Sequence, residues 1–173
     1  MPKPLAVDLP YPKLDGIIED YNSARIIMPA YASLHSELGA ILQYVYHNFF
    51  FSREGFKETA EILESISICE MNHLELLGKT LLRLGCDPVY AVKNLLSLEY
   101  FSTSEISYSK TPQKMLLDDI SGEMYAVEEY SRMIKKLTNE KVSAIISRIR
   151  LDEELHVLAL KEQLKKINQT PFL

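Results

Sequence analysis

The chain has 173 residues, of which 47% are hydrophobic and 25% charged, and its net charge is −5. This length suits one domain with its own core, and the apolar content excludes a disordered chain. No run of basic residues offers an electrostatic basis for binding nucleic acid, and no stretch is apolar for long enough to span a membrane or serve as a signal peptide. Two cysteines do not suggest a disulfide scaffold, so we expect a cytoplasmic protein.

The N-terminal segment contains four prolines, at positions 2, 4, 10 and 12. It is predicted to be an extended arm, of the kind that often wraps a partner subunit. A short amphipathic stretch at 17–27 follows, and Pro29 suits the first turn of a helix over 29–51. We therefore divide the chain into an arm with a lead-in segment, residues 1–28, and a bundle domain, residues 29–173.

Three more helices are expected. One covers 54–84 and is ended by Gly85, which favours the left-handed conformation of a helix C-terminus. Thr111 caps a third helix that reaches residue 137, and Asn139 caps a fourth that reaches residue 167. Short links make each consecutive pair an antiparallel hairpin, and a connection over 85–110 is long enough to cross the bundle. The prediction is an all-α up-down bundle of four helices, with two hairpins joined by a long crossover.

Two Glu-x-x-His quartets, Glu70 to His73 and Glu153 to His156, lie 83 residues apart. Residues three apart share a helix face, so each quartet aims a carboxylate and an imidazole in one direction. A single glutamate precedes each quartet by about 30 residues, on the apolar stripe of the preceding helix. The six predicted inward-facing ligands are Glu37, Glu70, His73, Glu123, Glu153 and His156.

The six residues are also predicted to lie at one height. Glu37 lies 14 residues before the end of its helix and Glu70 lies 16 after the start of the next, which places both about 21 to 24 Å from the shared turn. Glu123 and Glu153 have matching positions in the second hairpin. Two divalent cations would balance four carboxylates, and this set of oxygen and nitrogen donors suits Mn or Fe. The alternatives are an accidental buried polar layer and a vestigial site without metal.

Three further side chains are predicted to support this site. Tyr44 and Tyr130 each follow a single glutamate by two helical turns, so each would hydrogen-bond a metal-bound carboxylate or fill the core. Asp152 precedes the second quartet and is placed to accept a hydrogen bond from the outer nitrogen of a ligating histidine. His35 and His47 lie off the stripe and are not expected to bind metal.

At these residues the chain resembles the ferritin-like superfamily. The resemblance is carried by Ser36 to Tyr44, by Glu70 to His73 running on to the segment Leu84 to Tyr90, by Gly122-Glu123, and by Asp152 to His156. Within the superfamily it is strongest to the manganese-catalase branch, including its short spore-coat relatives, and then to the rubrerythrins.

The resemblance implies two Mn ions that disproportionate hydrogen peroxide, in a cytoplasmic or spore-associated homo-oligomer with no nucleic-acid or membrane partner. It gives Glu153 either of two roles, a catalytic proton carrier behind the ligands or a ligand that bridges the metals. The remaining five residues are implied as direct ligands: Glu37, Glu70, His73, Glu123 and His156.

Two other functions stay open. A rubrerythrin-like peroxidase or a ferroxidase would use Fe and an external electron donor. Ala126 disfavours the rubrerythrin assignment, because that branch usually carries another glutamate at this position. A structural or coat protein that keeps the fold with a vestigial site is the alternative without enzymatic activity.

Overall fold

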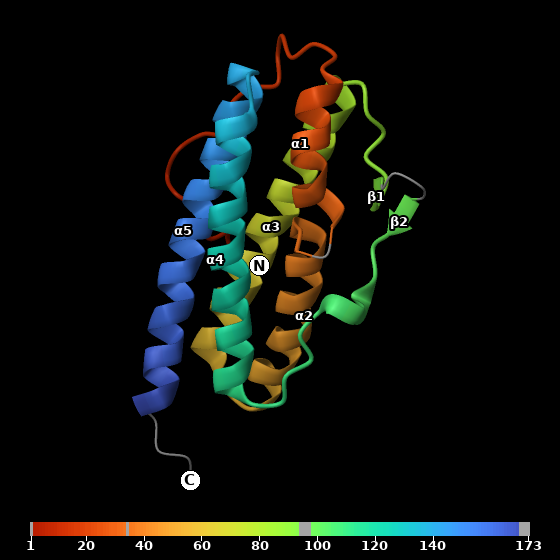
Figure 1. Ribbon diagram of the computed structural model, residues 1–173. Helices are drawn as coiled ribbons and strands as arrows, with labels where there is room; N and C mark the ends of the chain where they lie inside the picture. The colour runs from red at the N-terminus through yellow and green to blue at the C-terminus, as the bar shows by residue number, and fades with distance from the viewer. Residues whose placement is uncertain (1, 34, 94–97, 170–173) are drawn as a thin grey trace.

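The computed structural model describes residues 2–33, 35–93 and 98–169. Within these ranges helices account for most of the chain, and α2 pairs with α3 as α4 pairs with α5 (Figure 1). The predicted all-α four-helix bundle is confirmed, with α1 lying above α2 along the same side of α3. The α-helices are α1 (Tyr21–Ala32), α2 (Glu37–Arg53), α3 (Lys57–Arg83), α4 (Pro112–Lys136) and α5 (Glu140–Gln169).

The predicted helix ends are confirmed at three positions. Gly85 follows α3 with φ of 83°, where a residue with a Cβ would be strained, and the N–H of Cys86 donates to the carbonyl of Leu81 at 2.9 Å. Thr111 accepts a hydrogen bond from the N–H of Lys114, the third residue of α4, at 3.4 Å. Asn139 does the same for α5, at 3.2 Å. These local contacts depend on sequence neighbours alone, which is why the sequence predicts them.

The predicted start of the first bundle helix is wrong. Pro29 lies inside α1, which ends at Ala32, and a separate helix, α2, begins at Glu37. Ser36 has extended backbone and accepts the N–H of Gly39 at 3.4 Å, so it caps a new helix. Serine side chains compete for backbone N–H groups and favour helix ends, and this preference outweighs continuation from Pro29. The break makes Glu37 the first residue of α2.

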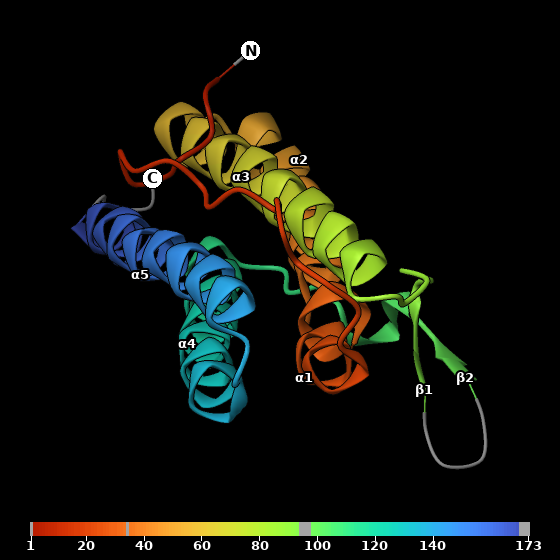
Figure 2. The same ribbon diagram turned by 90° about the horizontal axis from the view of Figure 1, so that it is seen from above.

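The long crossover joins the two hairpins as expected, but it contains structure that the sequence pattern did not reveal. Strands β1 (Ala91–Lys93) and β2 (Leu98–Tyr100) pair antiparallel, and a 3₁₀ helix, η1 (Thr103–Glu105), follows. Figure 2 shows the strand pair projecting away from the bundle. The crossover returns to the bundle at Ser107, whose N–H donates to Gln43 of α2 at 2.8 Å.

The buried apolar side chains form two clusters, one toward each end of the bundle. On α3 the cluster that contains Ile66 gives way to polar residues before the cluster that contains Leu77 begins. On α5 the same change occurs between Ile149 and Leu160. The bundle therefore has a polar layer between two apolar ones. No helix within the described ranges is long and apolar enough to cross a membrane.

Phe49 and Phe51 on α2 test which side chains belong to the core. Phe51 is 0% exposed and Phe49 is 67% exposed. Phe51→Ala leaves a cavity, so we expect it to lower the free energy of unfolding by about 3 to 5 kcal/mol. Phe49→Ala is the matched control and should change it by less than about 0.5 kcal/mol. Denaturant unfolding measures both, and equal losses would contradict the assignment of the core.

Candidate metal centre

The structure brings all six predicted residues into the polar layer. Glu37 begins α2, Glu70 and His73 lie on α3, and the others come from α4 and α5. Each is at most 4% exposed. The set is Glu37, Glu70, His73, Glu123, Glu153 and His156. Residues from four helices thus converge on one buried volume, as the helical spacing predicts.

The six residues fall into two groups, and within each group one ligand atom per residue lies within 4.8 Å of the others. Glu37 and His73 belong to the first group, and Glu123 and His156 to the second. Glu70 and Glu153 belong to both. Each group could hold one metal ion, and the two shared carboxylates lie where they could contact both ions.

Both histidines direct Nδ1 into this volume. His73 Nδ1 lies 3.0 Å from Glu70 Oε2 and 3.0 Å from Glu153 Oε1. His156 Nδ1 lies 2.9 Å from Glu70 Oε1 and 3.5 Å from Glu123 Oε1. The outer nitrogen of each ring has its own acceptor, Asp152 for His73 and the carbonyl of Leu5 for His156. Burial lowers the pKa of both imidazoles, but the charge of Glu70 beside His73 and of Glu123 beside His156 outweighs it and raises the pKa well above its usual value, so a metal ion would take the place of the proton on Nδ1.

Several buried polar atoms in the layer have no hydrogen-bond partner among the residues that the structure describes. They are Glu70 Oε1, Glu153 Oε1 and His156 Nδ1. His156 Nδ1 is close to Glu70 Oε1, but the two lack hydrogen-bond geometry. Buried polar atoms are normally paired, and an unpaired one costs about 1 to 3 kcal/mol. Metal ions would satisfy these atoms, so the donor set fits a pair of hard or borderline cations.

The carboxylates resist sharing this volume without a cation. Burial raises the pKa of Glu37 well above its usual value, and the neighbouring charge of Glu70 raises it further. Burial and the charge of Glu153 do the same for Glu123. A carboxylate whose pKa is raised in the fold is destabilising when it is charged. Ionising Glu37 and Glu123 beside Glu70 and Glu153 therefore costs free energy through burial and repulsion, and divalent cations would offset that cost.

The two tyrosines and Asp152 contact the six residues. The hydroxyl of Tyr44 donates to Glu123, and that of Tyr130 donates to Glu37. Burial raises the pKa of both phenols, so they stay protonated and can act as donors. Asp152 Oδ2 lies 3.0 Å from His73 Nε2. That these contacts support bound metal stays a prediction.

The N-terminal arm also reaches the site, which the sequence reasoning missed. It lies against its own bundle, between α3 and α5 (Figure 2). The carbonyl of Leu5 lies 2.8 Å from His156 Nε2, and Tyr11 donates to Asp152 at 2.7 Å. The prolines predict an extended arm but not its location. Arg148, four residues before Asp152 and paired with it at 2.7 Å, is the one contact in this group that sequence spacing could have indicated.

The other two histidines lie outside the two groups. His47 is buried, and its ring nitrogens lie 2.9 Å from Asp119 and 3.1 Å from the carbonyl of Ser107. It therefore fastens the crossover to α2 and α4. His35 is exposed, and its ring lies 4.8 Å from that of Tyr125.

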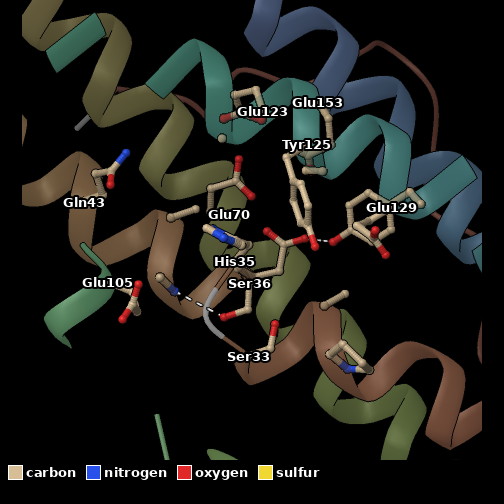
Figure 3. A pocket seen from close by; sticks show the side chains of 18 of the residues that line it. Ser33, His35, Ser36, Gln43, Glu70, Glu105, Glu123, Tyr125, Glu129 and Glu153 are labelled. Atoms are coloured by element: carbon tan, nitrogen blue, oxygen red, sulfur yellow. Dashed lines mark hydrogen bonds between the residues drawn. The ribbon is translucent and has the colours of Figure 1, made fainter. Parts of the chain in front are cut away.

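A cavity of about 110 Å³ leads to the polar layer from the side of α2 and α4. Figure 3 shows Glu70, Glu123 and Glu153 at one end, and Ser33 and Glu105 toward the other. The cavity exists because small residues line it where helices would otherwise close: Ala30, Ser36, Gly39, Ala40, Gly122 and Ala126. Its size admits water or a molecule of similar size, so small solutes can reach the carboxylates.

Comparison with known families settles the fold family. A model described as a ferritin-like domain matches residues 32–170. The chain belongs to this family. A comparison with curated proteins finds no significant match.

Three solved structures have the same fold. A manganese catalase, KatB from Anabaena PCC7120, superposes with a TM-score of 0.81 at 19% identity, over 96% of this chain and 82% of that one. Mycobacterium tuberculosis bacterioferritin BfrA gives 0.70 at 24% identity, over 88% and 89%. A dodecameric thioferritin from Bacteroides fragilis gives 0.69 at 18% identity, over 90% and 92%. The ferritin-like fold therefore hosts both a catalase and ferritins.

The cost of ionising Glu37 leads to a prediction for the protein without metal. Because the pKa of Glu37 is raised by folding, its stabilising contribution is complete below its unfolded value of about 4.5 and is lost as the pH rises toward the folded value. Glu37→Gln does not titrate, so in chelator it should be more stable than the wild type. The difference in the free energy of unfolding between this variant and the wild type should grow by up to about 1.4 kcal/mol per pH unit between pH 5 and 8.

Thermal melts in chelator across this pH range measure the effect. Glu61→Gln on the exposed face of α3 is the control and should show no such trend. With excess Mn²⁺ the wild type should be more stable than Glu37→Gln, because an amide is a weaker ligand than a carboxylate. If the wild type stays more stable than Glu37→Gln in chelator at pH 8, ionised Glu37 does not destabilise the metal-free protein and the prediction is wrong.

Proposed function

We propose that the protein is a non-haem catalase with a dinuclear manganese centre. The observation that carries the proposal is the pair of overlapping ligand groups at the end of a cavity of about 110 Å³. Four carboxylates and two neutral imidazoles carry four negative charges, which two divalent cations balance. Oxygen and imidazole donors suit Mn and Fe, and the likeness in fold to a manganese catalase is the reason to choose Mn.

In this proposal Glu37 and His73 would hold one ion, Glu123 and His156 would hold the other, and Glu70 would contribute to both, since it belongs to both groups. The bound pair would supply the two-electron redox capacity that the conversion of two molecules of hydrogen peroxide into O₂ and two of water requires. Tyr44 and Tyr130 orient the terminal carboxylates by donating to Glu123 and Glu37. The apolar layers above and below exclude bulk water, which strengthens every charge interaction inside.

Glu153 is proposed to carry the proton. It lines the cavity and is 1% exposed, and among the described residues its Oε1 makes no hydrogen bond of good geometry, although His73 Nδ1 lies 3.0 Å away. A carboxylate that lines the cavity can take the proton of an entering peroxide and return it to the departing water. Burial and the charge of Glu70 raise the pKa of Glu153, but its contacts with Glu123, His156 and His73 outweigh them and hold the pKa below its usual value, so the group is ionised and can accept a proton.

The test is oxygen evolution from hydrogen peroxide by the Mn-loaded protein, without any electron donor. We expect Glu153→Gln to keep two metal ions per chain and to lower kcat at least 100-fold, because a general base of this kind contributes roughly 10²- to 10⁴-fold. Glu129→Gln changes a carboxylate that lines the same cavity outside the two groups, and it should leave both quantities unchanged.

Each other outcome has a defined meaning. Loss of metal in Glu153→Gln would assign Glu153 as a bridging ligand instead of a proton carrier. Peroxide consumption that requires an electron donor would favour the peroxidase. Oxidation of Fe²⁺ by the iron-loaded protein, without oxygen evolution from peroxide, would favour the ferroxidase. A metal-loaded wild type without either activity would refute the catalase.

A further inference from the structure

We infer that the N-terminal arm is part of the metal centre, and that residues 5–11 position both histidines and thereby set the metal affinity. This inference rests on the proposed dinuclear site, but not on what reaction the site performs. The arm belongs to none of the bundle helices, yet it lies along the seam between α3 and α5 (Figure 2), and the carbonyl of Leu5 lies 2.8 Å from His156 Nε2.

His156 depends on the arm directly. Leu5 donates its N–H to the carbonyl of Ser65 on α3 at 3.0 Å, and its own carbonyl accepts from His156 Nε2 on α5 at 2.8 Å. A carbonyl can only accept, so this contact holds the proton on Nε2. It therefore fixes the tautomer in which Nδ1 has a free lone pair facing Glu70 and Glu123.

His73 depends on the arm through Asp152. This carboxylate accepts from the N–H of Val7 at 2.7 Å and from the hydroxyl of Tyr11 at 2.7 Å. It also pairs with Arg148 at 2.7 Å and lies 3.0 Å from His73 Nε2. An acceptor with three other donors is a carboxylate rather than a carboxylic acid, so the proton on this contact belongs to His73. The arm thus supplies two of the groups that hold Asp152 in place.

Arg148 locks the arm onto this network. Its guanidinium donates to the carbonyls of Val7 and Leu9 at 2.8 to 2.9 Å, and it stacks over the ring of Tyr11 at 4.4 Å. The side chain is 6% exposed although it is charged. A buried guanidinium with these partners indicates that the arm has a defined position on the bundle.

The arm contributes little to the core itself. Among residues 2–14 no residue is fully buried, although Leu5, Tyr11 and Leu14 pack against the edges of the two apolar clusters. Loosening the arm should therefore leave the helices intact and act on the histidines. Groups that orient a metal-bound histidine are worth about 10- to 100-fold in metal affinity.

The test compares Mn²⁺ affinity in three variants of the full-length protein by competition with a chelator of known affinity. Val7→Pro removes the N–H that Asp152 accepts, and Val7→Ala keeps it and serves as the matched control. Tyr11→Phe removes the hydroxyl and keeps the ring under Arg148. We expect Mn²⁺ affinity about 10-fold lower or more for Val7→Pro and Tyr11→Phe, and unchanged for Val7→Ala.

Two readouts separate positioning from a general structural role. Circular dichroism and melting in chelator should be the same for Tyr11→Phe and the wild type, while the nitrogen couplings in pulsed EPR of the Mn²⁺-loaded protein should differ. Unchanged affinity in both Val7→Pro and Tyr11→Phe would overturn the inference. If these variants bind metal weakly and the wild type binds two ions but evolves no oxygen, the proposed catalase activity is refuted. The inference about the arm then still stands. A wild type that binds no metal would refute both.

Discussion

Four carboxylates buried in one layer of an apolar bundle are the constraint on which the rest of the structure depends. Each ion removed from water costs several kcal/mol unless it is compensated, and Glu37, Glu70, Glu123 and Glu153 also repel one another. Within the described residues no lysine or arginine side chain is paired with any of these four. The two imidazoles face these carboxylates through Nδ1 and are held from outside through Nε2, so each would bind a metal ion as a neutral ligand once the ion displaces the proton on Nδ1. Divalent cations are the compensation that this geometry fits.

The bundle contains and protects this layer by simple means. Apolar clusters close it above and below, paired hairpins bring four helices to one height, and the two tyrosines donate to Glu123 and Glu37. Small residues on α2 and α4 line a cavity that reaches the layer. On the opposite side the arm covers the seam between α3 and α5 and reaches both histidines. The protein therefore has an open side for solutes and a closed side that supports the ligands.

Much of the candidate site could be predicted because it depends on helical periodicity. The spacing of three within each quartet and the equal distances from each turn bring the six residues together whatever the exact helix ends. The contacts of Tyr44, Tyr130 and Asp152 follow from the same periodicity. The position of the arm could not be predicted, since Leu5 and Val7 act through backbone groups that any residue carries. The break before Glu37 was missed because Pro29 favours a helix start, although Ser36, which accepts the N–H of Gly39, is a local signal that could have indicated it.

Anomalous diffraction from crystals of the Mn-loaded protein would decide whether the polar layer holds two metal ions, because it locates each ion among named side chains. We expect two peaks per chain, one surrounded by Glu37, Glu70, His73 and Glu153, and the other by Glu70, Glu123, Glu153 and His156. Cys69, His73 and Asp152 form a third group of potential ligands on the outer side of the imidazole. A single peak at that group, or no peak in the polar layer, would contradict the dinuclear centre.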